Sequence, residues 1–427
     1  MSVTAVVGLQ WGDEAKGKIV DLLSPSAQIV ARFNGGDNAG HTVINSYGTF
    51  KVRLIPNGFS SPNTACVIGP GVVVNPATLI DEIQRVQSSG LEIEDRLWVS
   101  PRCHIVMPYH RLLESVYEGA KGAAKTGTTQ RGIGPVFADK VSYNGIRFFD
   151  LADEQVFTRK LRIQLSIKNR ILSAFGVQPL EFDEVCKEIF TQCQELKAYI
   201  REPFGMIQET LSNQGEILLE GAQGALLDNN WGTYPFCTAS ITLSGGASAG
   251  LGIAPRWIQR VVGVAKAYTT RVGAGPMPSE LLDQTGELLQ KAGAEYGTVT
   301  GRARRCGWFD SELVRFTCQL NGCTEIALTK LDVLDGLDRI KICVGYRLPG
   351  EVERLRHYWE LDAEQLEKCE PVAIDLPGWQ QPTTLLRSFQ QLPEAAQAYV
   401  HKVEELVGVP VRFVSVGPER EATIQVF

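Results

Sequence analysis

Two acidic and two basic residues lie in a short glycine loop near the start of the chain. Residues 12–18 read GDEAKGK, in which the two glycines and the final lysine have the spacing of a phosphate-binding loop. Backbone N–H groups of such a loop attract phosphate at the start of a helix, and Lys18 can add a positive charge. Ile19 stands where these loops carry a magnesium-binding hydroxyl. Asp13 is then the nearest oxygen ligand for this hard cation, although it could instead cap the helix.

A second glycine loop, residues 34–42, reads NGGDNAGHT and contains one of only five histidines in the chain. A histidine at this place can give a proton or a hydrogen bond to a phosphate, because its ordinary pKa lies near neutral pH. The loop therefore favours a chemical role for His41. A histidine on a surface loop is the alternative interpretation.

Two further stretches indicate which ligands the chain binds. In ALTKLDVLDG, residues 327–336, the carboxylate of Asp332 can accept hydrogen bonds from N1–H and the 2-amino group of guanine, while Lys330 packs its stem on the base. Adenine offers no such pair of donors. In TVTGRARRCGW, residues 298–308, three arginines follow a glycine, and arginine suits the bidentate capture of carboxylate or phosphate. A solvated basic stretch is the alternative for these arginines.

Strands must position these loops. Apolar runs rich in β-branched residues occur at residues 3–9, 29–33, 66–68, 217–219, 260–270, 325–329 and 411–416, and glycine-containing loops follow them. This pattern predicts a large, mostly parallel central sheet buried by flanking helices, with ligands beyond the carboxyl ends of its strands. Residues 151–215 predict a helical subregion, and residues 393–407 a late helix. We therefore expect a single α/β domain over 1–427, like the P-loop NTPases, with helical and loop insertions.

Composition and charge restrict the partners. The net charge is −6, whereas a nucleic-acid-binding domain is usually basic, so we expect small-molecule ligands and no nucleic acid. We find no signal peptide and no apolar run long enough for a bilayer, which predicts a cytoplasmic protein without a membrane contact. The ten cysteines contain no Cys-x-x-Cys pair, so buried reduced thiols are expected rather than a metal site or disulfides.

Taken together, these stretches resemble the adenylosuccinate synthetase family of GTP-dependent purine ligases, over essentially the whole chain. The resemblance is carried, in family order, by QWGDEAKGKIVDLL, GGDNAGHT, TGTTQRGIGP, EGAQGALLD, GTYPFCTAS, RVGAGPMPSEL, TGRARRCGWFD, TKLDVLDGL and GPER. It implies that the protein joins IMP and L-aspartate while GTP is converted to GDP and phosphate, through a 6-phosphoryl-IMP intermediate. It also implies Mg²⁺ as cofactor and a homodimer as the working form.

The resemblance assigns roles to individual residues. Asp13 would remove the N1 proton of the hypoxanthine ring, and Lys16, His41 and Gln223 would assist catalysis. Asp13 and the Gly40 carbonyl would bind magnesium. GTP would contact Gly12, Asp13, Glu14, Ala15, Lys16, Gly17, Lys18, Gly40, His41, Thr42, Arg304, Lys330, Leu331, Asp332, Ser415, Val416 and Gly417. IMP and aspartate would contact Asn38, Ala39, Thr129, Gln223, Thr238, Thr298, Val299, Thr300, Gly301, Arg302 and Arg304.

The chain departs from the family pattern in loops that would hold IMP. Tyr143 replaces the arginine with which one subunit would reach the IMP phosphate of the other. The further departures are Ala15, Gln130, Ala239, Ile241 and Ala303. Three hypotheses therefore stay open: an adenylosuccinate synthetase with an altered IMP pocket, a paralogous ligase that joins aspartate to a modified purine nucleotide, and a GTP-binding regulatory protein without activity.

Overall fold

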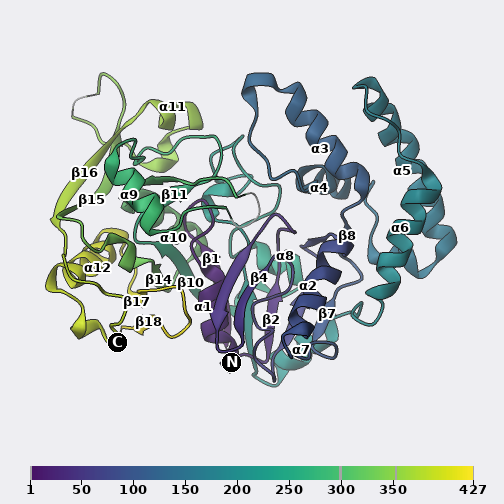
Figure 1. Cartoon of the computed structure of the whole chain (residues 1–427), viewed down its shortest axis with the longest axis horizontal. Coiled ribbons are helices and arrows are strands. Elements are labelled where there is room, and N and C mark those ends of the chain that lie inside the picture. Colours follow the sequence, from purple (N-terminus) through teal and green to yellow (C-terminus); the bar gives the residue numbers. More distant parts are fainter. Residues whose placement is uncertain (1, 298–300, 352, 427) are drawn as a thin grey trace.

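A nine-stranded sheet forms the centre of the molecule, as seen in the computed structural model, which describes residues 2–297, 301–351 and 353–426. From edge to edge it contains β18 (Thr423–Gln425), β17 (Val411–Ser415), β14 (Glu325–Thr329), β10 (Ile258–Lys266), β1 (Ser2–Gly8), β9 (Glu216–Glu220), β2 (Ile29–Arg32), β5 (Ala65–Ile68) and β7 (Leu97–Val99). Each neighbouring pair is parallel except β17 and β18. Figure 1 shows helices on both sides of this sheet.

The predicted mostly parallel sheet is confirmed. The seven apolar runs form seven strands that are consecutive neighbours, from β17 to β5. The bounds of one run were wrong: residues 260–270 are divided between β10 and β11 (Thr269–Arg271), which leaves the sheet and pairs with β12 (Arg305–Gly307). The expectation of one domain over residues 1–427 stays a prediction.

Both faces of the sheet are covered by helices, and successive side chains of a strand point to opposite faces. Val3, Ala5 and Val7 pack with α7 (Phe204–Ser212) and α8 (Gly246–Leu251). Val6, between them, packs on the other face with Ile19 of α1 (Lys16–Leu23). Ile19 is therefore a core residue, which explains an apolar side chain at this position of the phosphate loop.

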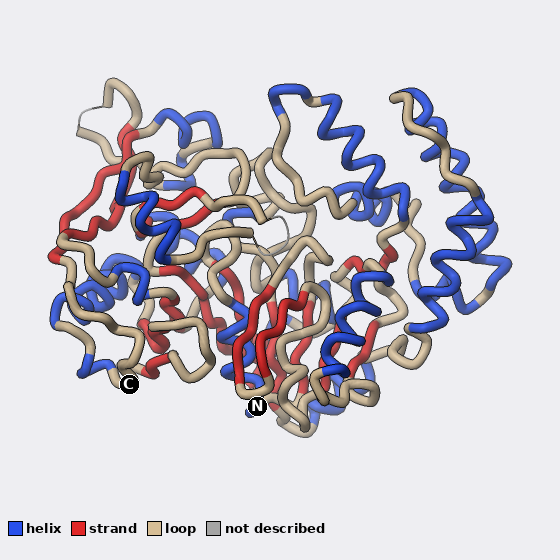
Figure 2. Tube along the Cα trace, in the orientation of Figure 1, coloured by secondary structure: helices blue, strands red, loops and turns tan. Residues whose placement is uncertain are grey.

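Additional elements surround the sheet at its two ends (Figure 1, and by type of structure in Figure 2). Helix α2 (Pro76–Ser88) packs against β5 and β7, and α3 (Pro108–Ala120), α4 (Ile133–Val141), α5 (Glu154–Ala174) and α6 (Phe182–Glu195) lie around this end. Helix α10 (Ser311–Asn321) contacts β10. Around the other end lie α9 (Gln284–Ala292), α11 (Ala363–Lys368), α12 (Glu394–Val407) and the sheet of β13 (Phe309–Asp310), β15 (Arg339–Arg347) and β16 (Glu370–Pro377). Helix α12 confirms the predicted late helix. Short pairs complete the fold: β3 (His41–Asn45) with β4 (Gly48–Val52), and β6 (Val73–Val74) with β8 (His104–Ile105).

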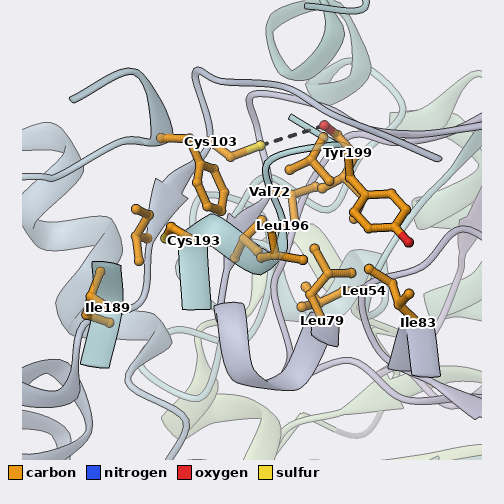
Figure 3. Close-up of a cluster of buried hydrophobic side chains, with 14 of the residues drawn as sticks. Leu54, Val72, Leu79, Ile83, Cys103, Ile189, Cys193, Leu196 and Tyr199 are labelled. Atoms are coloured by element: carbon orange, nitrogen blue, oxygen red, sulfur yellow. Dashed lines mark hydrogen bonds between the residues drawn. The ribbon is translucent and has the colours of Figure 1, made fainter. Parts of the chain in front are cut away.

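The predicted helical subregion, residues 151–215, contains α5, α6 and α7, but these helices serve two cores. Helix α7 packs against one face of the central sheet. Helices α5 and α6 belong to a separate cluster with α2, part of which Figure 3 shows around Leu79, Ile83, Ile189 and Cys193.

The cysteines agree with the expectation of reduced thiols. All ten cysteines are free thiols, and six of them are buried. Within the described ranges, no helix has the length and apolar character that crossing a membrane requires.

Candidate active site

The carboxyl ends of five adjacent parallel strands, β14, β10, β1, β9 and β2, carry the loops that the sequence singles out. Carboxyl ends of parallel strands lie on one edge of a sheet, so segments far apart in the chain meet there. Most residues of this candidate site come from loops after residues 8, 32, 220 and 329. The others come from the end of β17, from the loop that contains Thr129 and from the arginine loop that precedes β12.

The phosphate loop between β1 and α1 has an unusual backbone. Gly12, Asp13 and Ala15 all have left-handed φ angles, of 87°, 60° and 64°. The residue that caps α1 is Ala15, without a side-chain hydrogen bond, so the alternative role of Asp13 as helix cap is wrong. Such angles cost little for glycine but about 1–2 kcal/mol for most other residues, and they cluster at functional sites.

A buried carboxylate stabilises this loop from inside. Glu14 has no exposed surface, and its Oε1 accepts hydrogen bonds from the backbone N–H groups of Gln10 (3.1 Å) and Gly12 (2.8 Å). Its Oε2 accepts a bond of 2.6 Å from Nζ of Lys16. Lys16 is the first residue of α1, and its amine is ion-paired within the protein; its expected catalytic role stays a prediction.

The structure gives Lys18 other partners than the phosphate that the motif predicts. Its Nζ donates to Ser415 Oγ (2.6 Å) and to the carbonyl oxygens of Gly417 (2.7 Å) and Ala422 (2.9 Å). Burial lowers the pKa of this amine to about 8. Three oxygen acceptors hold the charge of Lys18 against residues 415–422, so here it ties α1 to β17. Ser415 and Gly417, which we expected around guanine, are two of those acceptors.

Asp13 is held by an arginine from the distant arginine loop. Arg304 Nε lies 2.8 Å from Asp13 Oδ2, and its Nη1 lies 2.7 Å from Oε2 of Glu295. The side chain of Arg304 is buried, whereas Asp13 is 28% exposed. Asp13 can therefore be reached from solvent while its orientation is fixed from the protein side.

His41 lies at the start of β3, directly against the phosphate loop. A Cβ atom added at Gly17 would lie 2.8 Å from the Cβ of His41, so the glycine permits this close contact. Nδ1 of His41 is 2.7 Å from Glu220 Oε1 and 2.7 Å from Asn57 Nδ2, which leaves Nε2 for a ligand. Burial lowers the pKa of His41, although Glu220 opposes this shift, and the pKa of Glu220 is itself lowered by its bond to the histidine. Nδ1–H of His41 can therefore donate to the carboxylate of Glu220, which favours the positively charged ring in which Nε2–H is a donor as well.

Two expected IMP contacts, Gln223 and Asn38, meet at the loop after β9. Nε2 of Gln223 donates to Asn38 Oδ1 over 3.0 Å, and Gln223 has a left-handed φ of 60°. Asn34, which sequence reasoning missed, connects the same loops: its Oδ1 accepts from Ala222 N (2.8 Å), and its Nδ2 donates to Ser240 Oγ (3.3 Å). An asparagine at a strand end is the only sequence signal for it.

The arginine loop meets the loop TGTTQRGIGP, residues 126–135, through Arg302. Its Nη2 donates to the carbonyl oxygen of Gly127 (2.9 Å), two residues before Thr129. Gly301 adopts a left-handed φ of 65°, which glycine permits. The predicted contacts Thr298, Val299 and Thr300 lie outside the described residues. Two oxygens near these loops, the hydroxyl of Thr238 and the amide oxygen of Gln223, are buried without a hydrogen-bond partner among the described residues.

The candidate guanine site has an unpartnered acceptor. Oδ1 of Asp332 is buried and has no hydrogen-bond partner within the described part of the chain. Burial raises the pKa of this carboxyl group. Lys330 has a left-handed φ of 59°, and its Nζ donates to Gly293 O and to Glu295 Oε1, each over 2.7 Å. The side chain of Lys330 is therefore held in place through its amine. The neighbouring Leu331 and Val416 are core residues, so only their backbone could contact a base.

The residues available for a magnesium ion fit its chemistry. Mg²⁺ is usually held by one or two carboxylates together with substrate phosphates and water. Asp13 offers a partly exposed carboxylate, and Gly40, half-buried one residue before His41, offers a carbonyl. No group of three or more His, Cys, Asp or Glu side chains suited to a metal ion occurs in the described ranges, so substrate oxygens would complete the coordination.

A parallel α/β sheet, a glycine loop before the first helix and polar loops at one edge define a nucleotide-binding enzyme of the phosphate-loop class. The model of the adenylosuccinate synthetase family matches residues 5–424. The curated adenylosuccinate synthetase of Heliobacterium modesticaldum is 48% identical to this chain, over 100% of this chain and 99% of its own length. That of an Exiguobacterium species is 47% identical, over 99% of this chain and 98% of its own length. The structure of fully ligated adenylosuccinate synthetase from Plasmodium falciparum superimposes with a TM-score of 0.93 at 35% identity, covering 100% of both chains. This chain belongs to the adenylosuccinate synthetase family.

Proposed function

We propose that the protein joins IMP and L-aspartate to form adenylosuccinate, with conversion of GTP to GDP and phosphate. Membership of this ligase family over nearly the whole chain carries the proposal. The alternatives, a paralogous ligase for a modified nucleotide and a regulatory protein without activity, are not favoured by relatives of this similarity. The site adds support, because Asp13, His41 and Asp332 all lie in loops at one edge of the sheet.

The residues suggest how the first step proceeds. Asp13 takes the proton from N1 of IMP, and the electron pair moves to the 6-oxygen, which attacks the γ-phosphorus of GTP as the bond to GDP breaks. Arg304 orients Asp13 from the protein side. His41, whose positively charged form Glu220 favours, donates from Nε2–H to the transferring phosphoryl group and stabilises its charge. When bound at Asp13 and Gly40, magnesium neutralises phosphate charge.

The second step exchanges phosphate for aspartate. The amine of aspartate attacks C6, and the 6-oxygen leaves with the phosphoryl group as phosphate. Arg302 and Arg304 bind the two carboxylates of aspartate, since their guanidinium groups form paired hydrogen bonds with carboxylates. Asn38 and Gln223, already joined by a hydrogen bond, hold the nucleotide.

Three further properties belong to this proposal. We propose a homodimer, supported by exposed apolar side chains at the end of α4, with Val141 72% and Tyr143 97% exposed. Light scattering in solution tests this assembly, and a monomer at working concentration would contradict it. We propose a cytoplasmic location, since ten free thiols suit a reducing compartment. We also propose that 1–427 folds as a single unit, which one cooperative unfolding transition would support.

A substrate panel tests the activity. The protein is incubated with GTP, magnesium, aspartate and IMP, dIMP, GMP or XMP in separate reactions, and product mass and released phosphate are measured. Adenylosuccinate formed from IMP, with one phosphate for each product, is expected. Faster reaction with another nucleotide would establish the paralogous ligase, and GTP binding without any product would establish the regulatory protein.

A further inference from the structure

A fully buried carboxylate, Glu295, lies between the parts of the site that serve different ligands. It follows α9 and has no exposed side-chain surface. Its Oε1 accepts hydrogen bonds from Lys266 Nζ (3.0 Å), Lys330 Nζ (2.7 Å) and the hydroxyl of Tyr268. Its Oε2 accepts bonds from Lys266 Nζ (2.9 Å) and Arg304 Nη1 (2.7 Å). Both carboxylate oxygens are therefore occupied by donors from four side chains.

Two of these donors lead in different directions. Lys330 follows β14 and lies two residues before Asp332, the candidate guanine acceptor. Arg304 contacts Asp13, the candidate base, with its Nε. Glu295 thus contacts Lys330 of the candidate guanine site directly, and it reaches Asp13 through Arg304.

The charges make this arrangement strong and specific. Burial alone would raise the pKa of Glu295, but Lys266, Lys330 and Arg304 hold it well below its ordinary value. Burial lowers the pKa of Lys266 to about 8, which still leaves the amine charged at neutral pH. A buried carboxylate opposite three cations is stable only while each keeps its partner, so removing the negative charge releases all of them together.

We propose that Glu295 is a positioning residue that holds Lys330 and Arg304 in fixed relation, and so couples the binding of guanine to the orientation of Asp13. The proposal rests on the proposed function for the identity of the reaction. The coupling explains why a lysine that packs on a base and an arginine that touches a catalytic carboxylate converge on the same two oxygen atoms. Lys266 and Tyr268, which lie outside the ligand loops, fix Glu295 itself.

The kinetic test compares Glu295→Gln with two other variants. In Glu295→Gln, KM for GTP should rise about tenfold or more because Lys330 loses its charged anchor, and kcat should fall by a similar factor through Arg304 and Asp13. Lys330→Met keeps the apolar stem and removes the amine, so it should raise KM for GTP and change kcat little. The matched control is Glu280→Gln, which removes the carboxylate bonded to Arg305 on β12; its kinetic constants should stay within about threefold of wild type, as expected for sites without shared partners.

A double variant separates coupling from general damage. If Glu295 acts on GTP binding through Lys330, then Glu295→Gln combined with Lys330→Met should have a KM for GTP close to that of Lys330→Met alone. Multiplying effects on KM would overturn the proposal, as would unchanged kinetics in Glu295→Gln. If Glu295→Gln does not fold, Glu295→Asp decides the question: its shorter carboxylate reaches fewer donors and should show the same two changes, and wild-type kinetics would contradict the coupling.

The outcome can be distinguished from failure of the proposed function. A wild-type protein that forms no adenylosuccinate would refute the function. Calorimetric titration with GTP would then still test the effect of Glu295 on GTP binding. Glu295→Gln should weaken GTP binding about tenfold, whereas Glu280→Gln should not.

Discussion

Replacing Asp332 by asparagine should abolish the preference for guanine while leaving a folded enzyme. The Oδ1 atom of Asp332 is buried without a partner in the described part of the chain, so guanine can supply the donors it lacks. A hydrogen bond to a charged group contributes about 1.5–3 kcal/mol. ITP lacks the 2-amino group of GTP and should therefore bind about 10- to 150-fold more weakly to the wild type. In Asp332→Asn the carboxylate is gone, and the two nucleotides should differ by less than about threefold.

The assay measures kcat/KM for GTP and for ITP at saturating IMP and aspartate. Asp335→Asn is the matched control, since this carboxylate accepts bonds from Trp379 and Thr383 and faces no ligand in our account. The control should keep the GTP preference even if its stability falls. A wild-type preference that survives in Asp332→Asn would refute the guanine assignment.

The same carboxylate predicts a dependence of GTP binding on pH. Burial raises the pKa of Asp332, so its neutral form persists to higher pH than in an exposed aspartate. Guanine donors bind the ionised form, and the affinity for GTP should therefore increase as the pH rises through this pKa, with release of a proton. In Asp332→Asn the affinity for GTP should no longer increase with pH in this range. An identical dependence of GTP affinity on pH in both proteins would contradict the assignment.

Four other substitutions test separate parts of the site. Asp13→Asn should abolish ligation and leave GTP binding within about threefold, as product assays and calorimetry would show; normal ligation would exclude Asp13 as the base. His41→Ala should lower kcat at least about 100-fold, the loss expected for one donor to developing charge, and a single-turnover rate near wild type would contradict that role. Ala15→Gly should raise the free energy of unfolding by up to about 1 kcal/mol, measured in urea, because glycine relieves the left-handed φ; a less stable variant would show that Ala15 is not strained. Tyr143→Arg should lower KM for IMP if a second subunit reaches the nucleotide phosphate from this exposed position, and an unchanged KM would exclude that contact.

The sequence predicted the sheet well because its signals are local. Each buried parallel strand is a short apolar run before a glycine loop, and all seven runs form neighbouring strands. The two edge strands, β7 and β18, and the sheet of β13, β15 and β16 were not anticipated. Edge strands of three residues have too little apolar periodicity to stand out.

The site was predictable in its loops but not in its ion pairs. Asp13 and His41 could be proposed from the sequence because their loops have recognisable composition. Glu295 was missed because its role depends on Lys266, Tyr268, Arg304 and Lys330, which no local pattern connects to it. For the same reason the sequence could not show that residues nearly 400 positions away accept the hydrogen bonds of Lys18; its expected contact with phosphate stays a prediction.

The fate of one oxygen atom tests the account most directly. IMP labelled with ¹⁸O at the 6-position is incubated with GTP, magnesium and aspartate, and the released phosphate is analysed by mass spectrometry. Attack of the 6-oxygen on GTP, followed by its departure with the phosphoryl group, predicts one ¹⁸O atom in each phosphate and none in adenylosuccinate. Unlabelled phosphate formed together with adenylosuccinate would contradict phosphoryl transfer to IMP, and with it the roles of Asp13 and His41.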